Sequence, residues 1–212
     1  MGNRQEGWQG RLRRALIGGA GVGEIGLDRW ILERARPDEP RLAGLRRAPM
    51  AEQVEVFREQ LDLAAELGRP ASIHCLEAWP DLLPVLNEVR MPAPGFLLHA
   101  YGGPADRMAA LARRGAYFSY SASFVAETPT ARALAFRQVP RERLLLETDA
   151  PAMPLAANFR RYQLAPGPDG RPLNHPANLT VAYDRLAAIL DLPVAALAAI
   201  AAENFKRLFG PA

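Results

Sequence analysis

Four side chains that bind metal ions or transfer protons stand at the ends of short apolar runs. They are Glu24, His74, His99 and Asp149. The chain has only three histidines, and two of them occupy such a position. Catalytic groups in α/β barrels lie at the carboxyl ends of buried parallel strands. Because imidazole and carboxylate ligands suit Zn²⁺, Mn²⁺ or similar divalent ions, the pattern predicts that the four residues converge on a metal site.

A site with this composition is suited to hydrolysis. A divalent ion lowers the pKa of a bound water and supplies hydroxide at neutral pH. Two ions bridged by a carboxylate can hold both oxygens of a phosphodiester displacement. We therefore expect one or two ions of Zn, Mn or Mg at the point where Glu24, His74, His99 and Asp149 converge.

Strands and helices alternate along the chain, which implies parallel βαβ units. The clearest helix is residues 51–68, where Val54, Phe57 and Leu61 follow a three-to-four spacing. The predicted strands are residues 20–25, 71–74, 95–99, 116–121 and 144–147. The other predicted helices are residues 7–17, 80–88, 105–114, 129–138, 178–190 and 193–209. Residues 29–50 and 153–177 are predicted to be loops.

The bulk composition is that of one globular domain spanning residues 1–212. The chain is 49% hydrophobic and 23% charged, and its net charge of +3 permits binding to a polyanion without arguing for it. No apolar stretch approaches the roughly 20 residues that span a bilayer. Residues 1–14 show no secretory signal, and the single cysteine, Cys75, fits a reducing compartment. We expect a cytoplasmic protein that does not bind membranes, and the sequence indicates no oligomeric state.

Several motifs resemble those of the TatD family of metal-dependent hydrolases, described as deoxyribonucleases. They are Gly23-Glu24-Ile25-Gly26-Leu27-Asp28, Ile73-His74, His99 with Gly102-Gly103, Leu144-Leu-Leu-Glu-Thr-Asp149-Ala-Pro151, and Ala202-Glu-Asn204-Phe-Lys-Arg-Leu208-Phe209. The resemblance implies a TIM barrel, with DNA as the substrate. Glu24 resembles the glutamate that bridges two metals, and His74 and His99 resemble the other ligands of the second metal. Asp149 resembles the aspartate that ligates the first metal and takes the proton of the attacking water.

The sequence departs from the family pattern in three places. No histidine precedes His74, whereas the family begins with a His-x-His pair on its first strand. Leu76 stands where the family usually has an arginine, and Leu173-Asn174-His175-Pro176 replaces Arg-Asn-Glu-Pro. A closed barrel has eight strands in typically about 250 residues, and five are predicted here. We therefore expect an incomplete barrel that lacks its first three strands and has an open edge.

These departures leave two other functions open. The chain could be a catalytically weakened or inactive fragment that keeps part of a metal site. It could instead be an amidohydrolase-like enzyme acting on a small molecule, because a fold does not fix its substrate.

Other polar and aromatic residues have two interpretations each. Asp28 is either a group that supports a metal ligand or a helix cap. His175 is either an ordinary loop residue or a substrate contact. Trp79, Tyr101 and Tyr120 either stack on bases or pack in the core. Arg160 and Arg161 are the expected phosphate contacts. Cys75 has no neighbouring base that would make it a nucleophile.

Overall fold

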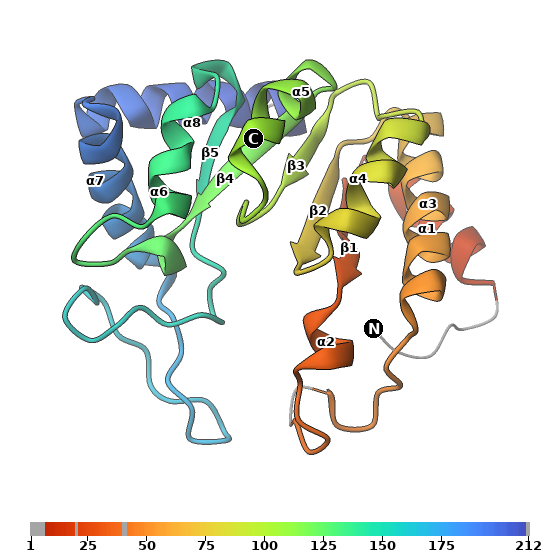
Figure 1. Ribbon diagram of the computed structural model, residues 1–212, viewed down its shortest axis with the longest axis horizontal. Coiled ribbons are helices and arrows are strands. Elements are labelled where there is room, and N and C mark those ends of the chain that lie inside the picture. The colour runs from red at the N-terminus through yellow and green to blue at the C-terminus, as the bar shows by residue number, and fades with distance from the viewer. Residues whose placement is uncertain (1–6, 20, 40–41, 211–212) are drawn as a thin grey trace. The chain divides into compact units, whose positions relative to one another are not determined.

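The computed structural model describes residues 7–19, 21–39 and 42–210. The chain forms two compact units that divide between Leu98 and His99 (Figure 1). Within each unit the paired strands are parallel, as the alternation of strands and helices predicts. The described residues contain five strands, fewer than the eight of a closed barrel. A single domain over residues 1–212 stays a prediction.

The first unit is built on three strands, in which β1 pairs with β2 and β2 pairs with β3. Its elements are α1 (Trp8–Ile17), β1 (Val22–Asp28), α2 (Trp30–Glu33), α3 (Met50–Glu66), β2 (Ala71–Leu76), α4 (Trp79–Glu88) and β3 (Phe96–Leu98). Helices α3 and α4 flank β1 and β2 (Figure 1). Helix α3 buries Phe57, Leu61 and Ala64 completely. These positions follow the helical period, so one apolar face of α3 packs on the strands.

Glycines in β1 allow its close approach to β2. A Cβ at Gly23 would lie 2.9 Å from the Cβ of Ser72, and a Cβ at Gly26 would lie 2.0 Å from the carbonyl oxygen of His74. Gly26 also has a φ of +138°, which side-chain-bearing residues rarely adopt. Glycine at these two positions therefore allows the backbone of β1 to lie directly against β2 at His74.

The end of β1 is fixed to α3 by Gln53, a buried polar residue. Its side-chain oxygen accepts a hydrogen bond from the backbone N–H of Asp28 at 2.8 Å. Its side-chain nitrogen donates to the carbonyl oxygens of Asp28, at 3.2 Å, and Ala48, at 2.9 Å. Gln53 thus satisfies backbone groups that the sheet leaves without partners, and it fixes the position of Asp28.

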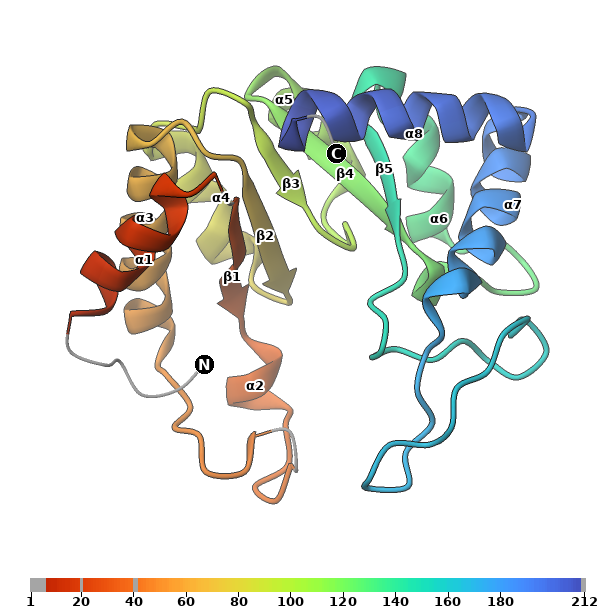
Figure 2. The same cartoon turned by 180° about the vertical axis from the view of Figure 1, so that it is seen from behind.

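The second unit is built on the parallel pair β4 (Ala116–Ser121) and β5 (Leu144–Glu147). Its α-helices are α5 (Met108–Arg113), α6 (Ala131–Ala135), α7 (Leu179–Leu190) and α8 (Val194–Phe209). Its 3₁₀ turns are η2 (Ala105–Arg107), η3 (Ala122–Phe124), η4 (Phe136–Gln138), η5 (Arg141–Arg143) and η6 (Pro176–Asn178). Every residue of β4 is buried, and α7 and α8 flank the two strands (Figure 2).

The tail motif has a structural role in this unit. Asn204 of α8 is buried, and its amide nitrogen donates to the carbonyl oxygens of Arg141, at 2.7 Å, and Leu144, at 2.9 Å. These two carbonyls lie at the entrance to β5. Asn204 therefore attaches α8 to the strand that precedes Asp149.

Most predicted elements are confirmed, with four corrections. The helix predicted over 105–114 is the 3₁₀ turn η2 followed by the short α5. The loop predicted over residues 29–50 contains the single helical turn α2. The helix predicted over 129–138 is the short α6 followed by the 3₁₀ turn η4. The strand predicted over 20–25 continues to Asp28, because the parallel pairing with β2 extends to the Asp28–Leu76 pair. Residue 20 lies outside the described residues.

Among the described residues, no single helix has the length and hydropathy of a membrane span. Residues Pro176–Leu190 and α8 meet that test only as a pair that bends by 106°.

Candidate metal site

In the first unit, His74 lies between two carboxylates. Its Nδ1 is 3.0 Å from Oε1 of Glu24, and its Nε2 is 3.4 Å from Oδ2 of Asp28. The side chain of Glu24 is 49% exposed, whereas that of Asp28 is only 9% exposed. The predicted neighbours Glu24 and His74 are thus brought together, although neither stands at the end of its strand. Glu24 is the third residue of β1 and His74 the fourth of β2.

Asp28 combines the two roles that the sequence left open. Its Oδ1 accepts a hydrogen bond from the backbone N–H of Ile31 at 3.0 Å, which caps the turn of α2. Its other oxygen faces His74. Because Gln53 also fixes its backbone, Asp28 is a well-anchored carboxylate that orients the imidazole ring.

The two carboxylates determine the charge of His74. Burial of the ring lowers its pKa, but the hydrogen bonds and charges of Asp28 and Glu24 outweigh this effect and raise the pKa of His74 to about 9. In the absence of a metal, the ring therefore carries a proton at neutral pH.

This protonation makes stability depend on pH in chelator-treated protein. The pKa of about 9 in the folded state lies above the ordinary value of 6.5. The stabilising contribution is therefore complete below pH 6.5 and is lost as the pH rises through 9. We expect the free energy of unfolding in urea to fall over this range, with His74→Gln flattening the profile. His175→Gln is the control that should keep the slope, and an unchanged slope in His74→Gln would contradict the assignment.

In the second unit, three acidic and imidazole groups form a compact cluster. Nδ1 of His99 lies 3.0 Å from Oε1 of Glu147 and 3.4 Å from Oδ1 of Asp149. One ligand atom from each of the three lies within 4.8 Å of the others. Their side chains are between 16% and 22% exposed. The predicted neighbours His99 and Asp149 are thus brought together, with Glu147 as a third member that the sequence prediction missed.

The two carboxylate oxygens of Glu147 differ in their hydrogen bonding. Its Oε2 accepts a hydrogen bond of 2.6 Å from the hydroxyl of Ser119 on β4, and that hydroxyl accepts one from the backbone N–H of Ala100. Its Oε1 is buried and accepts no hydrogen bond from the described residues, although Nδ1 of His99 lies 3.0 Å away. A buried carboxylate oxygen is costly without a partner. A metal ion would be such a partner, so the donor set of this cluster fits a divalent ion.

A model of the TatD related DNase family matches residues 16–210. This chain belongs to the TatD family. It is 28% identical over 189 residues to "Uncharacterized metal-dependent hydrolase YabD" of Bacillus subtilis, covering 89% of this chain and 64% of that protein. It is 31% identical over 213 residues to "3'-5' ssDNA/RNA exonuclease TatD" of Escherichia coli, covering 96% of this chain and 73% of that protein.

Solved structures of TatD family proteins have the same fold. The chain is similar to the TatD homolog YjjV of Escherichia coli, with a TM-score of 0.76 at 23% identity over 99% of this chain and 72% of that one. It is also similar to a TatD family hydrolase of Entamoeba histolytica, with a TM-score of 0.70 at 18% identity. This match covers 98% of this chain and 70% of that one. The predicted fold class, an α/β chain of the TIM-barrel type, is thus confirmed.

The relatives and the donor clusters together support a divalent metal ion. Each compact unit holds one pair of the predicted ligands, Glu24 with His74 and His99 with Asp149. The convergence of all four residues on one centre stays a prediction.

The late loop of this TatD family chain fixes the backbone around Asp149. The side chain of Asn174 donates to the carbonyl oxygens of Thr148, at 2.8 Å, and Met153, at 3.2 Å, and its backbone N–H donates to Pro151 at 2.8 Å. Asp149 itself has a φ of +56°, a left-handed conformation that is rare outside glycine. Asn174 therefore stabilises the turn that presents Asp149. The sequence drew attention to Asn174 only as part of a departure from the TatD pattern.

Other predicted contacts have structural roles. His175 accepts a hydrogen bond from the backbone of Ala177, as an ordinary loop residue does. Arg161 is one of the two expected phosphate contacts. It forms an ion pair of 2.6 Å with Asp184 instead. Burial raises the pKa of Cys75 to about 12, so its thiol is not nucleophilic at neutral pH. Tyr101 is buried in an edge contact with a phenylalanine ring, which favours packing over base stacking.

Proposed function

We propose that this chain is a metal-dependent phosphodiesterase that cleaves single-stranded nucleic acid, as a deoxyribonuclease. The observation that carries the proposal is the cluster of His99, Glu147 and Asp149, with its buried and unsatisfied carboxylate oxygen. Family membership and the exonuclease relatives support the same chemistry.

In this proposal, the residues of the cluster have different roles. His99 and Glu147 hold the ion, and Ser119 keeps the Glu147 carboxylate oriented through its 2.6 Å hydrogen bond. When bound, a divalent ion supplies a Lewis acid and lowers the pKa of water. Asp149, on its rigid turn, accepts the proton of the attacking water. A mixed imidazole and carboxylate donor set favours Zn²⁺ or Mn²⁺ over Mg²⁺.

The first unit contributes the remaining ligands in this proposal. Glu24 resembles the bridging glutamate of the family, and His74 resembles the second histidine ligand. That all four residues serve one metal centre rests on the motifs, and we retain it as part of the proposal.

The test is metal-dependent cleavage of an end-labelled single-stranded DNA and of a nitrophenyl phosphodiester. We expect cleavage with Mn²⁺ or Zn²⁺ and no cleavage with excess chelator. The His99→Ala variant should lose cleavage activity even with the metal ion present. His175→Ala removes a histidine of the same unit that lies outside the cluster, and it should retain activity.

Absence of phosphodiester cleavage with any divalent ion would overturn the proposal. A parallel panel of esters and amides separates the alternatives in that case. Turnover of an amide would favour an amidohydrolase-like enzyme, and no turnover at all would favour a catalytically inactive chain.

A further inference from the structure

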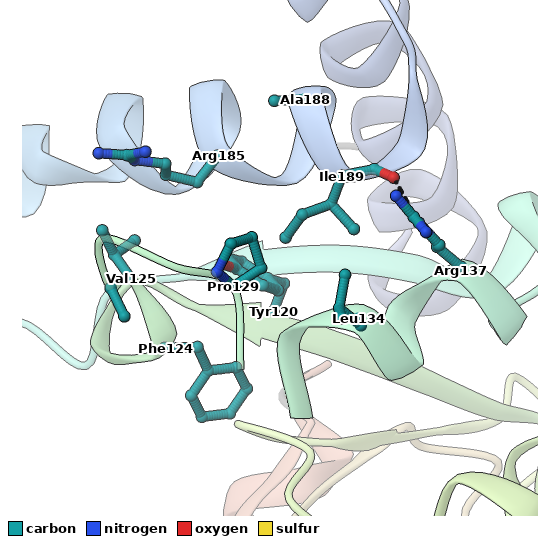
Figure 3. A pocket seen from close by; sticks show the side chains of 10 residues that line it. Tyr120, Phe124, Val125, Pro129, Leu134, Arg137, Arg185, Ala188 and Ile189 are labelled. Carbon is teal, nitrogen blue, oxygen red and sulfur yellow. Dashed lines mark hydrogen bonds between the residues drawn. The ribbon is translucent and has the colours of Figure 1, made fainter. Parts of the chain in front are cut away.

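A pocket of ≈ 150 Å³ lies in the second unit, on the face of β4 that is turned away from Glu147. Ser119 faces Glu147, and successive side chains of a strand point to opposite faces, so Tyr120 points into the helical layer. The pocket lies among β4, the segment after η3, α6 and α7 (Figure 3). Its apolar wall includes Phe124, Val125, Pro129, Leu134 and Ile189.

Tyr120 gives this apolar pocket a buried hydrogen-bond donor. Its side chain is only 1% exposed, and edge-on contacts with Phe124 and Phe136 fix its ring. Its side chain lines the pocket. Burial raises the pKa of Tyr120 to about 12, against the opposing charge of Arg185, so the hydroxyl keeps its proton. A protonated phenol hydroxyl on a pocket wall can donate a hydrogen bond to a ligand held there.

Two guanidinium groups border the same pocket on opposite sides of Tyr120 in Figure 3. Arg185 of α7 stacks on Phe159, with its charge 5.0 Å from the ring centre, and it has no carboxylate partner among the described residues. Arg137 donates its Nε to the carbonyl oxygen of Ile189 at 2.9 Å, which leaves its charge uncompensated. The pocket thus combines apolar walls, a phenol donor and two guanidinium groups, which is an environment suited to an anion with an apolar body.

We propose that this pocket binds a small apolar monocarboxylate of the size of benzoate. An apolar cavity of about 150 Å³ accommodates a benzene ring. The ring would lie against Leu134, Pro129 and Ile189. The carboxylate would accept a hydrogen bond from Tyr120 and pair with Arg185, since charge-assisted hydrogen bonds to arginine are the strong ones. The site lies on the opposite face of β4 from the Ser119–Glu147 pair, so it is independent of the proposed metal chemistry.

The test is calorimetric titration of the intact protein with benzoate, beside benzyl alcohol as the uncharged ligand of similar shape. We expect saturable binding of benzoate and at least about fivefold weaker binding of benzyl alcohol, because its hydroxyl can accept a hydrogen bond from Tyr120 but carries no charge to pair with Arg185. Tyr120→Phe and Arg185→Gln should each weaken benzoate binding by a similar factor. Tyr183→Phe and Arg113→Gln, outside the pocket, should bind benzoate as the wild type does.

Three results would overturn the proposal. The first is that benzoate does not bind at millimolar concentration. The second is that benzyl alcohol binds as tightly as benzoate. The third is that Tyr120→Phe and Arg185→Gln both bind benzoate with the affinity of the wild type. Arg185 is exposed, so Arg185→Gln remains decisive if Tyr120→Phe fails to fold.

Discussion

Asp149→Asn is expected to lower kcat/KM for a phosphodiester substrate by about 10³-fold or more, the range typical for loss of a positioned base. Asparagine keeps the shape of the side chain but cannot take a proton, and it is a weaker metal ligand. It also tolerates the left-handed conformation of residue 149, where φ is +56°, so the turn itself should survive. The measurement is steady-state kinetics at saturating Mn²⁺, with circular dichroism to verify the fold.

The chain offers a matched control for this substitution. Asp191 is also left-handed, with a φ of +53°, but it is exposed and ends α7. Asp191→Asn should leave kcat/KM unchanged. Activity of Asp149→Asn within about tenfold of the wild type would remove Asp149 from the role of base.

Gly26→Ala is expected to destabilise the first unit by about 4 kcal/mol or more, which is exceptional for a point substitution. The added Cβ would lie 2.0 Å from the carbonyl oxygen of His74, and the backbone there has a φ of +138°. The clash is with backbone rather than with a flexible side chain, so β1 and β2 must separate. Urea unfolding should therefore show a lowered midpoint, with His74 displaced from Glu24 and Asp28.

Gly10→Ala is the control for the loss of a glycine. Gly10 lies in α1, and the nearest atom to an added Cβ is the flexible Arg14 guanidinium at 3.6 Å. This substitution should be neutral or stabilise by up to about 1 kcal/mol. If Gly26→Ala had the same urea midpoint as Gly10→Ala, the close contact between β1 and the backbone of His74 would be contradicted.

Much of the architecture was predictable because short apolar runs and helical spacing are local signals. The helix predicted over residues 51–68 is α3, and the run Leu144–Glu147 is β5. The pairing of His99 with Asp149 was also predictable, since both follow strands whose ends carry polar groups. Helix α2 was not, because a single turn is too short to show a period.

The missed features depend on contacts between segments far apart in the sequence. The sequence pattern marks Glu147 only as the end of a strand, although Glu147 and Asp149 are two residues apart and so could share a face. Its role becomes visible only when β4 places Ser119 against it. Likewise, the glycines around Glu24 interrupt the apolar pattern of the strand, and only the pairing with β2 shows that β1 continues to Asp28.

The most direct test of the account is metal uptake by the intact protein. Titration of chelator-treated protein with Mn²⁺ or Zn²⁺ should show at least one ion bound per chain. His99→Ala should bind it at least about tenfold more weakly, the lower range for loss of a group that supports a metal site. A wild-type protein that takes up no divalent ion, or a His99→Ala protein with unchanged affinity, would contradict the account.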